Sequence, residues 1–176
     1  SSRIKGLGNA GVSFINTSDP QTGQGYPGSA LLALRTTGVK DILVDWTGGT
    51  VTANPRSYGL RLQWRTGTNG TFTDVLDALG QPVEYVRNPA SGHRQVFAGV
   101  RLPAAVDDQP VIQLRWRYHS LPQPDDSGAR AELLLDDIRV TGTVIQTTPF
   151  TLRVTMDNNR AALSVQGAAQ AACALW

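Results

Sequence analysis

The chain has 176 residues, of which 40% are hydrophobic and 17% are charged, and its net charge at neutral pH is only +2. This length and composition suit one domain with a real core plus a short appendage. The small net charge excludes the broad positive field of a nucleic-acid-binding protein, and no run of about 20 apolar residues that could span a membrane is present.

The basic residues are strongly biased, with 14 arginines against 2 lysines. The planar guanidinium group matches carboxylate, sulfate and phosphate groups, so the bias is compatible with oxyanion recognition; genomic base composition is the alternative cause. Cys173 is the single cysteine, which excludes an internal disulfide. The chain begins without Met and ends inside an apolar run, so we expect it to be a fragment of a longer protein.

Alternating apolar residues and frequent turn signals predict about nine short strands and no long helix. In chain order the predicted strands span residues 11–16, 30–35, 42–46, 58–66, 72–76, 83–86, 95–102, 112–118 and 131–140. Gly48 and Gly49 are expected to end the third strand. Turn signals about every 8–12 residues are typical of a sandwich or jelly roll. The predicted fold is therefore all-β, an antiparallel jelly-roll-type β-sandwich over residues 1–142.

Residues 143–176 follow a different pattern. A Thr-rich connector leads into two short alternating segments, 150–154 and 161–165, separated by a turn at 157–159. We expect a linker and the start of a second small β-unit, which gives the sandwich a short C-terminal β extension.

Two segments, 60–65 and 112–118, alternate strictly between large apolar residues on one side and Arg or Gln on the other. If the two strands are neighbours, their polar side chains form one surface, which we call the arginine face: Arg61, Gln63, Arg65, Gln113, Arg115 and Arg117. Guanidinium and amide groups bind hydroxyls and oxyanions, which favours a polysaccharide or glycan ligand, and an acidic one above all. The alternative is an ordinary solvated face, balanced by Asp and Glu on neighbouring strands.

Aromatic residues divide into two groups by their phase. Trp46, Trp64 and Trp116 share the phase of the apolar residues and are predicted to lie in the core. Tyr118 ends its strand, and Tyr26 and Tyr58 lie in or beside loops, so these tyrosines are better candidates for stacking on a sugar. Tyr118 is therefore included in the predicted ligand-binding set.

Asp136 and Asp137 follow three leucines near the end of the predicted sandwich. Neighbouring residues of a strand face opposite sides, and a buried carboxylate needs a cation or several donors. A structural calcium, completed by backbone carbonyls of the N-terminal loop, would satisfy this requirement, with Asp137 the favoured ligand. The alternative is a salt bridge to a nearby arginine.

No catalytic set is visible in the sequence. His93 and His119 are the only histidines, and no nucleophile or metal spacing converges on them. Glu84 and Glu132 fall on separate strands, so a glycosidase-like carboxylate pair cannot be argued from their spacing. We therefore expect the chain not to be an enzyme.

Several segments between residues 3 and 142 form one pattern: RIKGLG (3–8), FINT (14–17), SALLAL (29–34), GGTV (48–51), GLRLQWR (59–65), VEYVRN (83–88), LRWRY (114–118) and ARAELLLDDIRV (129–140). Together they resemble a β-sandwich module repeated in large secreted bacterial proteins. The ending LDDIRV is similar to the last strand of many jelly-roll carbohydrate-binding modules, in which one aspartate of the pair often helps to hold a structural calcium.

The resemblance implies a secreted or cell-surface location, neighbouring domains of a parent protein as partners, and a polysaccharide or cell-surface glycan as ligand. We thus predict a non-catalytic accessory module that binds glycan through its Arg/Gln/Tyr face. The alternative is a structural spacer or surface-adhesion domain with protein partners and no small ligand.

Overall fold

The structure is a computed structural model, and it describes residues 4–15, 28–122, 128–146, 151–157 and 160–166. The chain divides into two compact units, Ser1–Val144 and Ile145–Trp176. The described residues form strands and two short 3₁₀ helices, η1 (Gly8–Ala10) and η2 (Ala104–Val106), but no α-helix. Within these same residues no helix has the length and apolar character needed to cross a bilayer.

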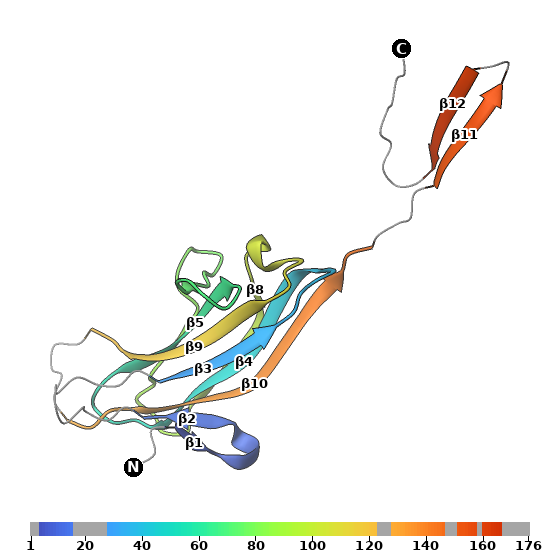
Figure 1. Cartoon of the computed structure of the whole chain (residues 1–176). Coiled ribbons are helices and arrows are strands. Elements are labelled where there is room, and N and C mark those ends of the chain that lie inside the picture. The colour runs from blue at the N-terminus through green and yellow to red at the C-terminus, as the bar shows by residue number, and fades with distance from the viewer. Residues whose placement is uncertain (1–3, 16–27, 123–127, 147–150, 158–159, 167–176) are drawn as a thin grey trace. The chain divides into compact units, whose positions relative to one another are not determined.

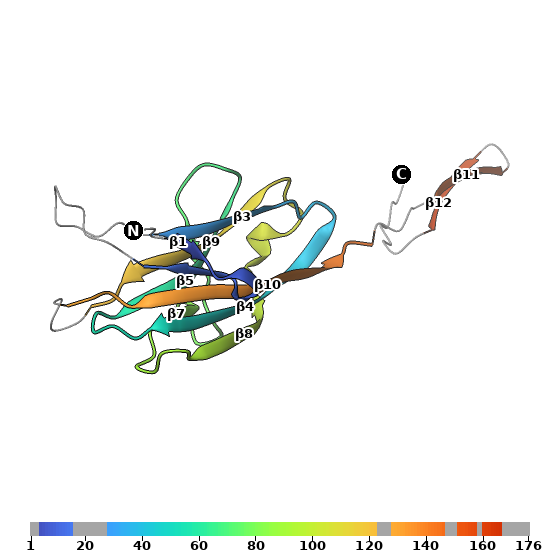
Figure 2. The same ribbon diagram turned by 90° about the horizontal axis from the view of Figure 1, so that it is seen from below.

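The first unit consists of two antiparallel sheets (Figures 1 and 2). The strands of one sheet, in spatial order, are β1 (Ile4–Gly6), β2 (Val12–Phe14), β10 (Glu132–Val144), β4 (Val39–Thr52) and β8 (Arg94–Arg101). The other sheet has the order β3 (Ser29–Leu34), β9 (Ile112–Ser120), β5 (Tyr58–Thr66) and β6 (Thr73–Asp74), with β7 (Glu84–Val86) also paired to β5.

The strand pairings are nested, which identifies the sandwich as a jelly roll. β2 pairs with β10, β3 with β9, β4 with β8, and β5 with β7. The chain therefore runs as one long hairpin whose successive strand pairs alternate between the two sheets, as in a double Greek key. The predicted fold class is confirmed. The three-residue strand β1 was not predicted, because its residues are all exposed and carry no apolar alternation.

The core lies between the two sheets and is built from the alternating apolar residues of each strand. Trp46 stacks on Phe97 with ring centroids 4.1 Å apart and meets the edge of Trp116 at 6.3 Å. Both tryptophans are fully buried, as their phase predicts. Trp64 has the predicted inward phase but is only half-buried, packing against the core from its margin.

Strand β4 continues through Gly48 and Gly49, so the prediction that these glycines end the strand is wrong. Each glycine is needed for close packing. A Cβ atom on Gly48 would lie 2.6 Å from the Cβ atom of Tyr85, and one on Gly49 would lie 2.9 Å from the Leu134 side chain. Glycine in a strand often marks such a close approach rather than a break.

Strand β10 contains an irregularity that changes which of its residues face the core. Asp136 faces Thr47 and Arg139 faces Asp45, so Asp137 and Ile138 form a bulge between them, with a φ of 51° at Asp137. The bulge shifts the phase of the strand. Ile138 is 40% exposed as a result, although it is a large apolar residue.

The second unit contains an antiparallel hairpin of β11 (Thr151–Asp157) and β12 (Arg160–Gln166). It lies where the sequence predicts two alternating segments. Residues 143 and 144, which the sequence assigns to a linker, belong to β10 instead. Cys173 lies outside the described residues.

Candidate functional site

Strands β5 and β9 are neighbours, so the six residues of the arginine face lie on one surface. The register pairs Arg61 with Arg117, Gln63 with Arg115, and Arg65 with Gln113. The inward residues between them, including Leu62 and Trp116, are buried. Period-two alternation therefore places the guanidinium and amide groups together on the outer side of this sheet.

Two cross-strand arginine–glutamine pairs occupy the middle of the face. Nε and Nη2 of Arg65 donate to Oε1 of Gln113 at 2.8 and 2.5 Å. Nε and Nη2 of Arg115 donate to Oε1 of Gln63 at 2.9 and 2.6 Å. Each glutamine is nearly buried, with an exposed fraction of 6% for Gln63 and 8% for Gln113. Both amides therefore position the arginines, and little of their surface is left for a ligand.

Arg61 is held by two carboxylates from neighbouring strands. Its Nη2 donates to Oε2 of Glu84 and its Nη1 donates to Oδ2 of Asp74, both at 3.2 Å. The amide of Gln63 donates to Oδ1 of the same Asp74 at 2.6 Å. This end of the face is thus charge-balanced, which is the alternative that the sequence left open.

Glu84 also contacts Nε2 of His119, which lies on β9. The two side chains meet over Gly59 of β5, the strand that lies between β7 and β9. A Cβ atom at Gly59 would lie 2.5 Å from Oε1 of Glu84, so the contact depends on the glycine. Burial would raise the pKa of Glu84, but the hydrogen bonds and positive charges of His119 and Arg61 outweigh it and hold the pKa below its ordinary value. Glu84 is therefore a stable carboxylate at neutral pH.

The other end of the face carries positive charge without matching carboxylates. Arg65, Arg115 and Arg117 have no ion pair with any Asp or Glu in the described part of the chain. The guanidinium carbons of Arg65 and Arg115 lie 4.3 and 4.0 Å from the ring centroid of Phe72. Burial lowers the pKa of Arg115, and the charges of Arg117 and Arg65 lower it further. A negative charge at this end would relieve that repulsion.

Arg117 is the most available group of the face. It is exposed, and it forms no hydrogen bond or ion pair with the residues that the structure describes. Its cross-strand neighbour Arg61 turns toward Glu84 and Asp74, because two like charges directly opposite each other are unfavourable. On the other side of β9, the edge strand β3 adds Ser29 and the 55% exposed Leu31.

Tyr118 does not belong to the arginine face, so its predicted role in ligand binding is wrong. It shares the inward phase of Trp116, is 1% exposed, and donates its hydroxyl to the carbonyl oxygen of Ala131 at 2.7 Å. Tyr58 is buried as well and stacks on Tyr118 at 4.6 Å, so it cannot stack on a sugar either. Tyr26 lies outside the described residues.

The two candidate calcium ligands already have protein partners. Oδ2 of Asp136 accepts from Arg94 at 3.1 Å, and Oδ2 of Asp137 accepts from the Thr47 hydroxyl at 3.1 Å. Asp137 is exposed, so its carboxylate is solvated and does not require a cation. No group of three or more His, Cys, Asp or Glu is placed to hold a metal within the described segments.

Most of the N-terminal loop that was expected to complete this site lies outside those segments. Calcium binding stays a prediction. It is tested by whether added Ca²⁺ raises the melting temperature of the chain and whether Asp137→Asn abolishes that rise.

Three members of the site were missed by sequence reasoning: Phe72, Asp74 and Glu84. Asp74 and Glu84 lie in the short segments 72–76 and 83–86, which were predicted as strands, but nothing in their pattern indicates that both pair with β5. His119 falls in the outward phase of β9, and that phase places it at the end of the arginine face from the sequence alone.

Comparisons with known proteins leave the chain without an assigned relative. No protein-family model matches it, and neither the curated proteins nor the solved structures that were searched contain a match.

Proposed function

We propose that this chain is a non-catalytic accessory module that binds an acidic polysaccharide or glycan at the Arg115–Arg117 end of the arginine face. The observation that carries the proposal is a group of three arginines, Arg65, Arg115 and Arg117, that have no carboxylate partner among the described residues. Their charges repel one another on one side of a sheet, whereas Arg61 on the same face is neutralised by Glu84 and Asp74.

The chemistry of these arginines favours a polymer with carboxylate or sulfate groups. A guanidinium group donates parallel hydrogen bonds to both oxygens of such a group. In Arg115, Nε and Nη2 are used by Gln63, so the amide fixes the orientation of the guanidinium plane. Arg117 donates no hydrogen bond to any residue that the structure describes, and Leu31 beside Arg115 offers an apolar surface for the sugar ring. A uronic acid or a sulfated sugar combines these two features.

The resemblance to modules of large secreted bacterial proteins supports the wider part of the proposal. In such a protein the module would be secreted or displayed at the cell surface, and it would hold neighbouring domains of the parent protein close to a polysaccharide. Binding would then depend on several weak contacts along a polymer rather than on one deep site.

Affinity electrophoresis in gels that contain polygalacturonate or heparin tests the proposal. We expect both polymers to retard the chain, and added salt to weaken the retardation because exposed charges are screened. Arg115→Gln/Arg117→Gln should remove most of it. A matched control is Arg101→Gln/Arg139→Gln, which removes the same charge from two exposed positions of the other sheet. Equal loss in both double variants would indicate only nonspecific charge attraction and would overturn the proposal.

A structural spacer or surface-adhesion domain with protein partners is the second candidate. The observation that favours it is the hydrogen-bond network of Arg61, Gln63, Asp74 and Glu84. These side chains bond to one another, so their donors and acceptors are already used within the protein. A face of this kind is rigid and well solvated without any ligand. If no acidic or neutral polymer retards the chain, this second function is the better one.

A further inference from the structure

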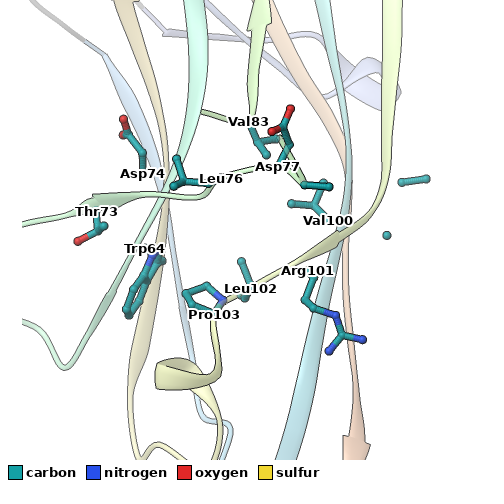
Figure 3. A pocket seen from close by; sticks show the side chains of 13 residues that line it. Trp64, Thr73, Asp74, Leu76, Asp77, Val83, Val100, Arg101, Leu102 and Pro103 are labelled. Atoms are coloured by element: carbon teal, nitrogen blue, oxygen red, sulfur yellow. The ribbon is translucent and has the colours of Figure 1, made fainter. Parts of the chain in front are cut away.

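A pocket of about 730 Å³ opens at the edge of the first unit, where β6 and the segment after it face the end of β8. Its apolar wall is formed by Trp64, Leu76, Val83, Val100, Leu102 and Pro103. Figure 3 shows Trp64 and Pro103 at one end of the opening, and Val83 and Asp77 at the other. A cavity of this size with a mostly apolar lining is typical of small-molecule sites.

The pocket exists because the sheet that contains β5 ends early at this point. β6 is only two residues long and pairs with β5 at Gln63 and Trp64. The end of Trp64 is therefore not covered, although the residue has the phase of the core. Leu76 at the margin of the pocket is 53% exposed. A ligand in the pocket would cover this exposed apolar surface, which favours binding of a partly apolar molecule.

Of the ionisable groups that line the pocket, Asp77 has no ion-pair partner among the described residues. Both oxygens of Asp74 accept hydrogen bonds, from Arg61 and Gln63, on the arginine face. Arg101 pairs with Asp41 at 2.8 Å and extends away from the other labelled side chains in Figure 3. Oδ1 of Asp77 accepts from two backbone amides of its own turn, and its Oδ2 has no partner in the described residues.

We propose that this pocket binds a small amphipathic amine, whose apolar body packs on Trp64 and whose ammonium group pairs with Asp77. An aromatic ring face and a carboxylate both attract a cation, while the same carboxylate disfavours an anion. The pocket would thus select the opposite charge from the arginine face. The site is independent of the proposed function, because its wall contains none of Arg65, Arg115 and Arg117.

Three probes of similar shape test the charge preference: phenethylamine, 2-phenylethanol and 3-phenylpropanoate. Each is titrated into the full chain, and the indole N–H signal of Trp64, assigned with a Trp64→Phe variant, is followed by NMR. We expect saturable shifts with phenethylamine, weaker ones with 2-phenylethanol, and the weakest with 3-phenylpropanoate. Methyl β-glucoside serves as a neutral sugar probe.

Two variants test the roles of the residues. Asp77→Asn keeps an Oδ1 acceptor for the two turn amides but removes the charge. It should weaken phenethylamine binding about two- to fivefold, as expected for the loss of an exposed ion pair, and leave 2-phenylethanol binding unchanged. Ala98→Phe should fill the pocket and abolish binding of both. Val96→Phe is the matched control, because Val96 is 69% exposed on the same strand and does not line the pocket.

The assignment is overturned by any of four results. These are no saturable shift with phenethylamine, equal affinities for the three charge forms, unchanged phenethylamine affinity in Asp77→Asn, or saturation by methyl β-glucoside in place of the amine. None of these results depends on whether acidic polymers bind the arginine face, so the two proposals succeed or fail separately.

Discussion

The two sides of strand β5 are stabilised by different interactions. On the inner side, Leu60 and Leu62 are completely buried and contact the opposite sheet's core residues. On the outer side, Arg61, Gln63 and Arg65 are held by hydrogen bonds to β6, β7, β9 and the β5–β6 turn. The inner side is stabilised by removal of apolar area from water, which needs no particular partner. The outer side depends on particular donors and acceptors, so its geometry changes when one partner is removed.

The difference also explains where ligands could bind. At Trp64 the inner side reaches the edge of the sandwich and leaves an apolar pocket with a carboxylate at its rim. At Arg115 and Arg117 the outer side leaves cations without carboxylate partners among the described residues. The two proposed binding surfaces therefore adjoin opposite sides of the same strand and would prefer ligands of opposite charge.

The largest expected effect is on the inner side of β5. Leu62→Ala should lower the free energy of unfolding by about 3 kcal/mol, because a fully buried leucine leaves a cavity in the core. Urea unfolding at neutral pH measures the change. Leu76→Ala is the matched control and should cost well under about 1 kcal/mol, since Leu76 is 53% exposed. Similar losses in the two variants would show that the inner side of β5 is not the dominant source of stability.

On the outer side, Arg61→Ala should cost about 1–2 kcal/mol of unfolding free energy, because it leaves Glu84 and Asp74 without their shared cation. The same unfolding measurement applies, with Arg101→Ala as the control. Arg101 pairs with Asp41 at a largely exposed position, so its loss should have little effect. If the two substitutions cost the same, the network around Arg61 contributes no more than an ordinary surface ion pair.

The sequence predicts what depends on local alternation and fails where distant segments meet. The phases of β5 and β9 follow from period two, so the arginine face and the buried Trp116 could be predicted from residues 60–65 and 112–118. Tyr118 was misplaced because its position at a strand end suggested exposure, whereas its phase was inward. The phase of the alternation therefore predicts the burial of Tyr118 better than its position at the strand end does.

Other features depend on packing between elements. Gly48 and Gly49 carry the usual signal of a turn, yet Tyr85 and Leu134 require their small size within β4. The pairing of β6 and β7 with β5 brings Asp74 and Glu84 to Arg61, and no local pattern encodes that pairing. The pocket is also invisible in the sequence, because it arises from the short length of β6 relative to its neighbours.

Acid should weaken the outer side of β5 selectively. The pKa of Glu84 is held below its ordinary value of 4.5 in the folded chain, where burial opposes the shift and His119 and Arg61 outweigh it. The unfolded chain therefore takes up this proton first. The stabilisation is fully present above pH 4.5 and is lost as the pH falls through the lower folded-state pKa.

Urea midpoints measured between neutral pH and pH 3 test this prediction. Glu84→Gln should reduce the loss of stability over the acid part of that range, while Asp77→Asn, as a control on an exposed turn, should not. An identical pH dependence in the wild type and in Glu84→Gln would mean that other carboxylates account for the acid sensitivity.

The smallest effect on stability is expected at Arg117, and this is what makes it the sharpest probe of the outer side. Arg117→Gln should change the free energy of unfolding by less than about 0.5 kcal/mol, because the exposed guanidinium has no partner among the described residues to lose. Removing it should even relieve repulsion at Arg115, whose pKa is lowered first by burial and then by the charge of Arg117. The same variant should nevertheless lose a measurable part of the retardation by polygalacturonate. A fall in stability without a change in retardation would show that Arg117 stabilises the fold and does not bind the polymer. The proposal of an acidic ligand at the Arg115–Arg117 end of the face would then lose its main support.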